Sequence, residues 1–165
     1  MVYKAVFLDR DGVINDGSLY YTYLIDDFKI NKGVIEGLKL LQNHGFLLVI
    51  ITNQSGVAKG IYSGKDVEAV HEYLIEILRK HNVDIAGIYV CPHHPDISSC
   101  DCRKPKTALF EQAIRDLSVD VAHSYMIGDS ERDIIAGEKM GLRSVLIDKN
   151  ENILPYCKSI VQNKI

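Results

Sequence analysis

Short apolar runs alternate with longer amphipathic stretches along most of this chain. The apolar, β-prone runs are residues 4–8, 46–51, 86–90, 124–128 and 143–147. Apolar residues recur at helical spacing in residues 34–43, 65–80, 106–117 and 131–140. Continuous apolar strands that alternate with helices are typical of a parallel sheet covered on both faces. We therefore predict an α/β fold, a Rossmann-like three-layer sandwich with a mainly parallel sheet.

Length, composition and charge limit the class of protein. At ~150 residues per domain, 165 residues predict one domain spanning 1–165. The chain is 47% hydrophobic and 25% charged, which is globular composition. No apolar run approaches the ~18 residues needed to cross a bilayer, and the first residues lack the apolar core of a secretory leader. The net charge of −3 gives no broad basic face. We expect a cytoplasmic monomer that binds neither nucleic acid nor membrane.

Carboxylates follow two of the predicted strands. Asp9 and Asp11 come directly after the first strand, and Gly12 after them permits a tight turn. Side chains at i and i+2 of an extended chain point to one side, where two carboxylates repel each other unless a cation or a proton intervenes. A lone acidic pair also fits a solvated loop. The GDSERD segment adds Asp129 at another strand end, and an all-oxygen site suits Mg²⁺.

Asp133 lies one helical turn after Asp129. It can bind the metal directly, accept a hydrogen bond from a group beside the metal, or be an acid favoured by the helix dipole. We favour the second role.

Groups that can hold phosphate lie between the two acidic segments. Thr52 and Asn53 end the second strand beside a glycine, and Arg103 and Lys104 precede a predicted helix. Each segment is a weak signal alone. Their order along the chain, between the DxD pair and GDSERD, is specific. Residues 14–30 are predicted to form a flap over this site, and the tail after residue 148 a short helix or irregular segment.

Three of the four cysteines cluster beside two histidines, as Cys91-Pro-His93-His94 followed by Cys100 and Cys102. Three sulfurs and one imidazole satisfy a tetrahedral Zn²⁺ site. The alternative is a set of free cytosolic thiols, which such clustering disfavours. With all four positions filled by protein, the zinc would be structural and would brace the loop that carries Lys104.

In order along the chain, the DxD pair, Thr52-Asn53, Lys104 and GDSERD resemble the haloacid dehalogenase superfamily over about residues 4–148. More narrowly, the segments FLDRDG, TNQSG, CPHHP and CDCRKP resemble the heptose 1,7-bisphosphate 7-phosphatases and the histidinol-phosphate phosphatases. The resemblance implies no large cap domain. It implies Asp9 as nucleophile, Asp11 as acid/base, and Thr52, Asn53 and Lys104 as phosphate-binding residues. It implies Mg²⁺ on Asp9, the Asp11 carbonyl and Asp129, and zinc on Cys91, His93, Cys100 and Cys102.

The resemblance implies a Mg²⁺-dependent phosphatase of carbohydrate metabolism that acts through an aspartyl phosphate. We favour removal of the 7-phosphate from a heptose 1,7-bisphosphate. Arg103, ahead of Lys59, is the favoured cation for the second phosphate. Histidinol phosphate is the alternative substrate, because the short loop from His93 to Cys100 resembles that group. A non-catalytic zinc-braced interaction module has no reason to keep both DxD carboxylates. The net negative charge of the chain disfavours a polynucleotide 3′-phosphatase, whose substrate is itself negatively charged.

Overall fold

The computed structural model describes residues 1–165 and contains a five-stranded, all-parallel sheet in the order β3-β2-β1-β4-β5. The strands are β1 (Ala5–Leu8), β2 (Leu47–Asn53), β3 (Gly87–Cys91), β4 (Tyr125–Gly128) and β5 (Arg143–Leu146). Every connection between neighbouring strands therefore crosses over one face of the sheet. The α/β sandwich predicted from the alternating pattern is confirmed.

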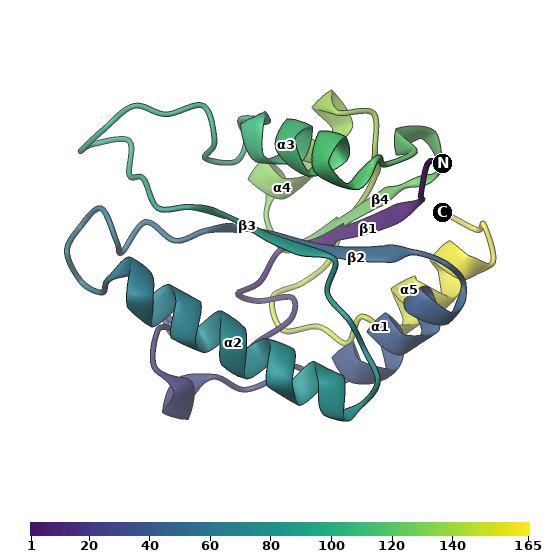
Figure 1. The fold of residues 1–165 in the computed structure, drawn as a ribbon, viewed down its shortest axis with the longest axis horizontal. Coiled ribbons are helices and arrows are strands. Elements are labelled where there is room, and N and C mark those ends of the chain that lie inside the picture. The colour runs from purple at the N-terminus through teal and green to yellow at the C-terminus, as the bar shows by residue number, and fades with distance from the viewer.

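Five helices cover the two faces of the sheet. They are α1 (Val34–Asn43), α2 (Gly64–Lys80), α3 (Ala108–Leu117), α4 (Glu131–Lys139) and α5 (Leu154–Val161). In Figure 1, α3 and α4 lie above the strands and α1, α2 and α5 lie below them. The sheet is thus the middle of three layers, with no additional cap domain.

Alternate residues of each strand supply two separate cores. Val6 and Leu8 of β1 pack with residues of α1, α2 and α5, whereas Phe7 packs with α3 and α4. Burying a side chain of this size stabilises the fold by about 1.5–3 kcal/mol. Because both faces are buried, the strands read as continuous apolar runs rather than as alternating ones.

The element boundaries differ from the predicted ones where functional residues are concerned. Strand β2 continues to Asn53 and β3 to Cys91, beyond the ends of the predicted apolar runs at residues 51 and 90. Helix α3 begins at residue 108 rather than 106, because the amide of Lys106 donates to the carbonyl of Arg103 and closes a separate turn. The tail forms α5, so the irregular alternative for this segment is wrong.

Residues 14–30 run from β1 back to α1 without a regular helix or long strand. Asn15 makes single bridges to Asp11 and to Ile30, and a 3₁₀ turn spans Ile25–Asp27. The segment is held by isolated contacts, and it passes over the carboxyl ends of the strands. This is the placement that the flap hypothesis requires.

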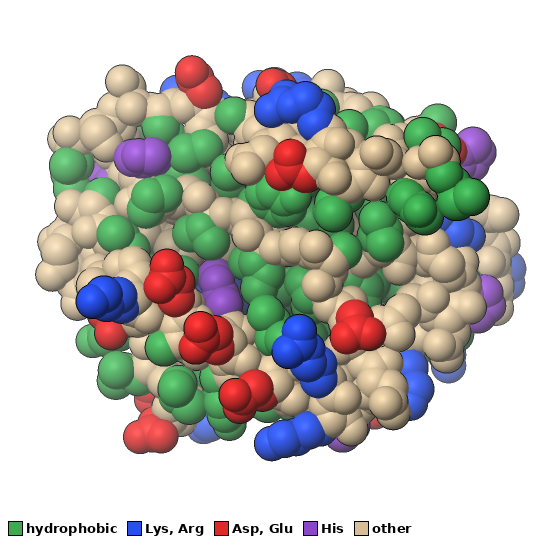
Figure 2. Space-filling model, in the orientation of Figure 1, with side chains coloured by type: hydrophobic (Ala, Val, Ile, Leu, Met, Phe, Trp, Pro, Cys, Tyr) green, Lys and Arg blue, Asp and Glu red, His purple; other side chains and the backbone are tan.

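The surface carries charges of both signs. On the face shown in Figure 2, acidic and basic side chains are interspersed and no continuous basic area is present. No helix of the protein combines the length and apolar content needed to cross a bilayer.

Candidate active site

The ends of β1 and β4 bring the first and last acidic segments together. Asp9 follows β1 and Asp129 follows β4, and these two strands are hydrogen-bonded neighbours. Gly12 turns the chain with a φ of +86°, and a Cβ on it would lie 2.1 Å from an Asp129 carboxylate oxygen. Only glycine permits both this backbone conformation and this close approach.

Asp9 is buried and is paired with the buried Lys104. Its Oδ1 accepts hydrogen bonds from Lys104 Nζ at 2.9 Å and from the Arg10 amide at 2.8 Å, which leaves Oδ2 without a donor. Burial raises the pKa of Asp9 to about 7; Lys104 opposes the rise and Asp133 adds to it. Further positive charge beside Asp9 would therefore favour its anionic form.

Lys104 lies between two carboxylates. Its Nζ is 2.9 Å from Asp9 Oδ1 and 2.7 Å from Asp133 Oδ1, and all three side chains are almost fully buried. Burial alone would lower the pKa of Lys104, but Asp9 and Asp133 more than offset it and the net shift is upward. The lysine is therefore a fixed positive charge at the base of the site.

Asp133 uses both of its oxygens within the protein. Oδ1 pairs with Lys104, and Oδ2 accepts from the amide and hydroxyl of Ser130 at the start of α4. A Cβ on Gly128 would lie 2.2 Å from the Asp133 Cβ, so the strand end allows this close approach. The geometry favours Asp133 as the group that orients Lys104 and caps α4.

The carboxylates of Asp9, Asp129 and Asp133 offer ligand atoms within 4.8 Å of one another. Lys104 pairs with the first and third but not with Asp129. Burial, together with the nearby Asp133, raises the pKa of Asp129. Hard oxygen donors and unbalanced negative charge fit Mg²⁺. The side chain of Asp11 does not belong to this group.

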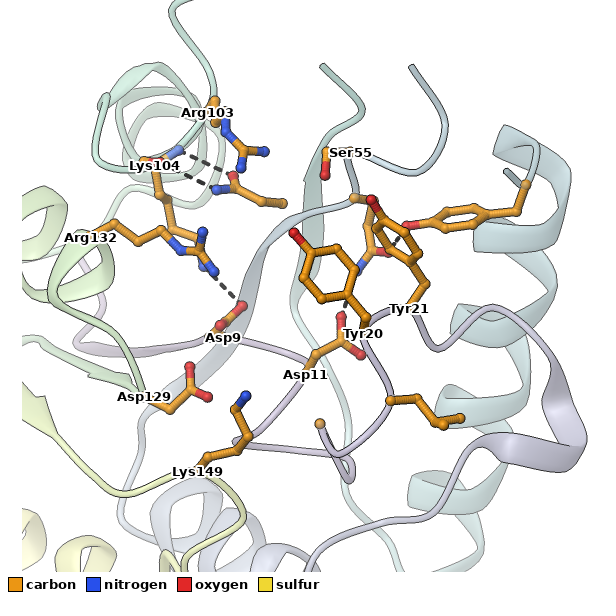
Figure 3. Close-up of a pocket in the computed structure, with 15 residues that line it drawn as sticks. Asp9, Asp11, Tyr20, Tyr21, Ser55, Arg103, Lys104, Asp129, Arg132 and Lys149 are labelled. Atoms are coloured by element: carbon orange, nitrogen blue, oxygen red, sulfur yellow. Dashed lines mark hydrogen bonds and ion pairs between the residues drawn. The ribbon is translucent and has the colours of Figure 1, made fainter. Parts of the chain in front are cut away.

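A cavity of about 180 Å³ opens above these carboxylates. Figure 3 shows Arg103, Lys104 and Arg132 on one side of it and Tyr20 and Tyr21 on the other. The predicted site residues that line it are Asp9, Asp11, Asn53, Arg103, Lys104 and Asp129. The cavity is also lined by Tyr20 and Tyr21 of the predicted flap and by Ser55 and Arg132, which lie in the TNQSG and GDSERD segments but were given no role. Lys149 also lines it and lies outside every predicted motif.

Two residues predicted to bind phosphate have other contacts in this structure. Thr52 is buried outside the cavity lining, and its hydroxyl accepts from Gln54. The Asn53 amide pairs in both directions with the backbone of Lys104, at 3.1 and 3.3 Å. Asn53 thus ties the lysine segment to the end of β2. Lys59, the second candidate for the distal phosphate, does not line the cavity.

Cys91, His93, Cys100 and Cys102 form the second candidate metal site, with ligand atoms within 4.8 Å of one another. The sulfurs of Cys91 and Cys100 are 3.7 Å apart, and His93 Nδ1 is 3.6 Å from the Cys91 sulfur. Zinc–sulfur bonds of about 2.3 Å imply tetrahedral edges of roughly 3.8 Å. None of the four cysteines forms a disulfide. The donor set fits Zn²⁺, and the imidazole in it is that of His93. The His94 ring lies beside the Asp96 carboxylate instead.

Arg10 and His71 form a buried contact that sequence analysis missed. Arg10 is fully buried, and its guanidinium lies between Asp11 and His71 Nε2, 3.2 Å from the latter. Burial first, and then Arg10, lower the pKa of His71 to about 4, so the ring is neutral at pH 7. No local pattern marks these residues, because the contact depends on how α2 packs beside β1.

Comparison with known proteins assigns the class. A family model described as HAD-hydrolase-like matches residues 101–153. The crystal structure of D,D-heptose 1,7-bisphosphate phosphatase from B. bronchiseptica, complexed with magnesium and phosphate, superposes with a TM-score of 0.90 at 26% identity, covering 97% of this chain and 99% of that one. The fold and the acidic strand ends thus define a haloacid-dehalogenase-like hydrolase.

Two sequence relatives show to which family of haloacid-dehalogenase-like hydrolases the chain is similar. The chain is 45% identical over 150 residues to the D-glycero-β-D-manno-heptose-1,7-bisphosphate 7-phosphatase of Haemophilus ducreyi, covering 87% of this chain and 82% of the relative. It is 40% identical over 163 residues to the Helicobacter pylori enzyme of the same name, covering 95% and 92%. The chain belongs to the heptose-1,7-bisphosphate 7-phosphatase family.

Proposed function

We propose that this protein hydrolyses the 7-phosphate of a D-glycero-D-manno-heptose 1,7-bisphosphate through an aspartyl-phosphate intermediate. The observation that carries the proposal is the buried Asp9, which lines the cavity and has one oxygen held by Lys104 and the other without a donor. The names of the relatives support the substrate class.

In the first step the free carboxylate oxygen of Asp9 attacks phosphorus, and the bond from phosphorus to the sugar oxygen breaks. Asp11, at the edge of the cavity, gives its carboxyl proton to the departing sugar oxygen. Lys104 lies 2.9 Å from the Asp9 carboxylate, close enough to stabilise charge on the phosphoryl oxygens.

In the second step a water molecule attacks the phosphorus of the aspartyl phosphate. The bond from phosphorus to Asp9 breaks, and the Asp11 carboxylate takes the proton that the water loses. Phosphate leaves, and Asp11 is again protonated for the next cycle. One carboxyl group serves both steps because the proton moves in opposite directions.

Asp9, Asp129 and the carbonyl of Asp11 are the proposed Mg²⁺ ligands, with Asp133 holding Lys104 beside them. Bound Mg²⁺ neutralises phosphate charge, so that the anionic Asp9 can approach phosphorus. A site of hard oxygen ligands with no thiolate near it supports this choice of metal.

The second phosphate of the substrate is assigned to Arg103. Its guanidinium lines the cavity and donates to the carbonyl of His93, and therefore the cysteine–histidine cluster fixes its position. Arginine binds phosphate through paired, charge-assisted hydrogen bonds. Relatives named for the α and the β anomer both match this chain, so either anomer fits the proposal.

Phosphate release tests the proposal directly. The protein, supplied with Mg²⁺, is assayed with heptose 1,7-bisphosphates of both anomers, histidinol phosphate and 3′-phosphorylated DNA. We expect the highest kcat/KM for one of the heptose bisphosphates. A higher kcat/KM for histidinol phosphate would replace the substrate assignment, and no release from any substrate would remove the phosphatase assignment.

A further inference from the structure

The carboxylate of Asp11 is held by more donors than any other acid in the cavity. Arg10 donates to Oδ1 from Nε at 3.2 Å and from Nη2 at 2.8 Å, and Asn15 donates to the same oxygen at 2.9 Å. Gln54 Nε2 donates to Oδ2 at 2.8 Å. A group that passes a proton in two directions must keep one position through both steps, and these donors define it.

Gln54 is the donor whose own orientation is fixed from behind. Its Oε1 accepts the hydroxyl of Tyr62 at 2.8 Å, so its Nε2 must face Asp11 and Thr52 Oγ1. Gln54 is 2% exposed and Tyr62 is 6% exposed. An amide held at both ends in this way cannot rotate by half a turn without breaking buried hydrogen bonds.

The tyrosine that orients Gln54 is itself packed against the flap. The Tyr62 ring stacks on Tyr23 with centroids 4.9 Å apart and meets Tyr21 edge-on at 5.6 Å. A Cβ on Gly56 would lie 2.0 Å from the Tyr62 ring, so the glycine leaves room for it. Tyr21 also lines the cavity, as Figure 3 shows.

We propose that Gln54, oriented by the Tyr62 hydroxyl, is a positioning residue for Asp11 and connects the tyrosine flap to the acid/base. The inference rests on the proposed function, because it assumes that Asp11 protonates the leaving oxygen. Gln54 lines the cavity but makes no hydrogen bond to Asp9 or Lys104, so its effect on the reaction is assigned to the hydrogen bond that it donates to Asp11.

The leaving group separates this role from a structural one. A sugar alkoxide needs the proton of Asp11 to depart, whereas nitrophenolate leaves without it. The ratio of kcat/KM for heptose bisphosphate to kcat/KM for p-nitrophenyl phosphate therefore reports how well Asp11 is placed. General acid catalysis contributes about 10²–10⁴-fold, so a misplaced acid should lose roughly 10–100-fold.

The test compares Gln54→Met with Gln42→Met, both with Mg²⁺ present. Gln42 is a matched control because its amide is likewise hydrogen-bonded at both ends, but at the exposed end of α1, where Nε2 donates to the Asn82 carbonyl and Oε1 accepts from the Asp84 amide. We expect Gln54→Met to lower kcat/KM for heptose bisphosphate about 10–100-fold and for p-nitrophenyl phosphate less than about 3-fold. Gln42→Met should leave the ratio unchanged.

Tyr62→Phe is the second variant, because it keeps the ring stack and removes only the hydroxyl. It should shift the ratio in the same direction by a smaller factor, and Tyr89→Phe, which loses a hydroxyl bonded to Asp116, should not. Equal losses on both substrates would overturn the inference. A raised KM with kcat unchanged would also overturn it, since that result means that Gln54 contacts the substrate. If the unmodified protein is inactive on both substrates, that result contradicts the proposed function rather than the role of Gln54.

Discussion

The acidic centre and the cysteine–histidine cluster lie near the same edge of the sheet, but they are held in different ways. Asp9 and Asp129 directly follow strands, and Asp133 sits in a capped helix turn. In the cluster, Cys91 ends β3, while the other three ligands belong to a loop without helix or strand. Residues 95–99 of that loop are exposed.

The two sites therefore differ in what orders them. Packing of the protein holds the acidic centre, whereas metal ligation holds the cysteine–histidine cluster. Buried strand ends fix the carboxylates whether or not a cation is bound. The cysteine loop buries little apolar surface, so metal bonds must supply the ordering energy that packing supplies elsewhere. Lys104 connects the two regions, because its backbone pairs with Asn53 at the loop's end and its ammonium pairs with Asp9 in the acidic centre.

Replacing the nucleophile tests the acidic centre most directly. Asp9→Asn keeps the shape of the side chain but removes the attacking carboxylate. Because packing holds the centre, the variant should fold normally while kcat falls about 10⁴-fold or more. Steady-state phosphate release and a thermal melt measure the two quantities. Near-normal turnover with Mg²⁺ present would show that Asp9 is not the nucleophile.

Removing the connecting lysine should affect both chemistry and folding. Lys104→Met leaves Asp9 and Asp133 buried without their cation, which costs about 3–5 kcal/mol of unfolding free energy. Loss of a charge at the phosphoryl group should lower kcat about 10²–10³-fold. Urea unfolding and kinetics give both values.

Lys139→Met, at the exposed end of α4, is the control for loss of a lysine. If it destabilises the protein as much as Lys104→Met does, the buried ion pairs do not support the acidic centre.

The sequence could predict the acidic centre because its residues adjoin strand ends. Parallel strands end at one edge of the sheet, so Asp9 and Asp129 were expected to meet there, with Asp11 near them, once the strands were recognised. The contacts of Gln54 and Arg10 could not be predicted in this way. They depend on side-chain rotamers and on how the chain from β2 to α2 packs over β1.

For the cysteine–histidine cluster, the residue types could be predicted from the sequence but the local geometry could not. Residue types alone predicted its donor set, but spacing could not decide between His93 and His94, which are adjacent in the chain. The structure selects His93, since its Nδ1 lies 3.2 Å from the Cys102 sulfur. Local backbone geometry in an irregular loop is not encoded by hydrophobic periodicity.

Breaking the zinc site should disturb the loop without removing the chemistry. Cys100→Ser should lose the zinc and lower kcat/KM roughly 10–100-fold, because the segment that carries Arg103 and Lys104 is no longer braced. Elemental analysis of protein purified without added metal should find one zinc per chain. Cys157→Ala, whose thiol is buried against Gly37, should keep it. A zinc-free parent with freely alkylated Cys91, Cys100 and Cys102 would contradict the assignment.

Arg103→Ala tests what the braced loop contributes to specificity. Charge-assisted hydrogen bonds contribute about 1.5–3 kcal/mol each, so loss of this side chain should cost roughly 10–100-fold in kcat/KM for a heptose bisphosphate. A monophosphate that carries only the scissile group should be affected much less. Equal losses on both substrates would mean that Arg103 does not bind the second phosphate.

The smallest expected effect is the pH dependence of the unfolding free energy that is caused by the buried His71. His71 has a folded-state pKa of about 4, below its usual value near 6.5, because burial and Arg10 disfavour the charged ring. The unfolded chain therefore binds the extra proton first. The stabilising contribution of neutral His71 is complete above pH 6.5 and is lost as the pH falls towards 4.

Between pH 7 and pH 5 this linkage should lower the unfolding free energy by about 2 kcal/mol. His71→Gln removes the titrating ring and keeps an acceptor for Arg10, so its stability should fall less over that interval. His81→Gln, on the exposed end of the same helix, should keep the slope of the parent. Urea unfolding at both pH values measures the difference. If His71→Gln also keeps the parent slope, packing does not hold His71 neutral in the folded protein.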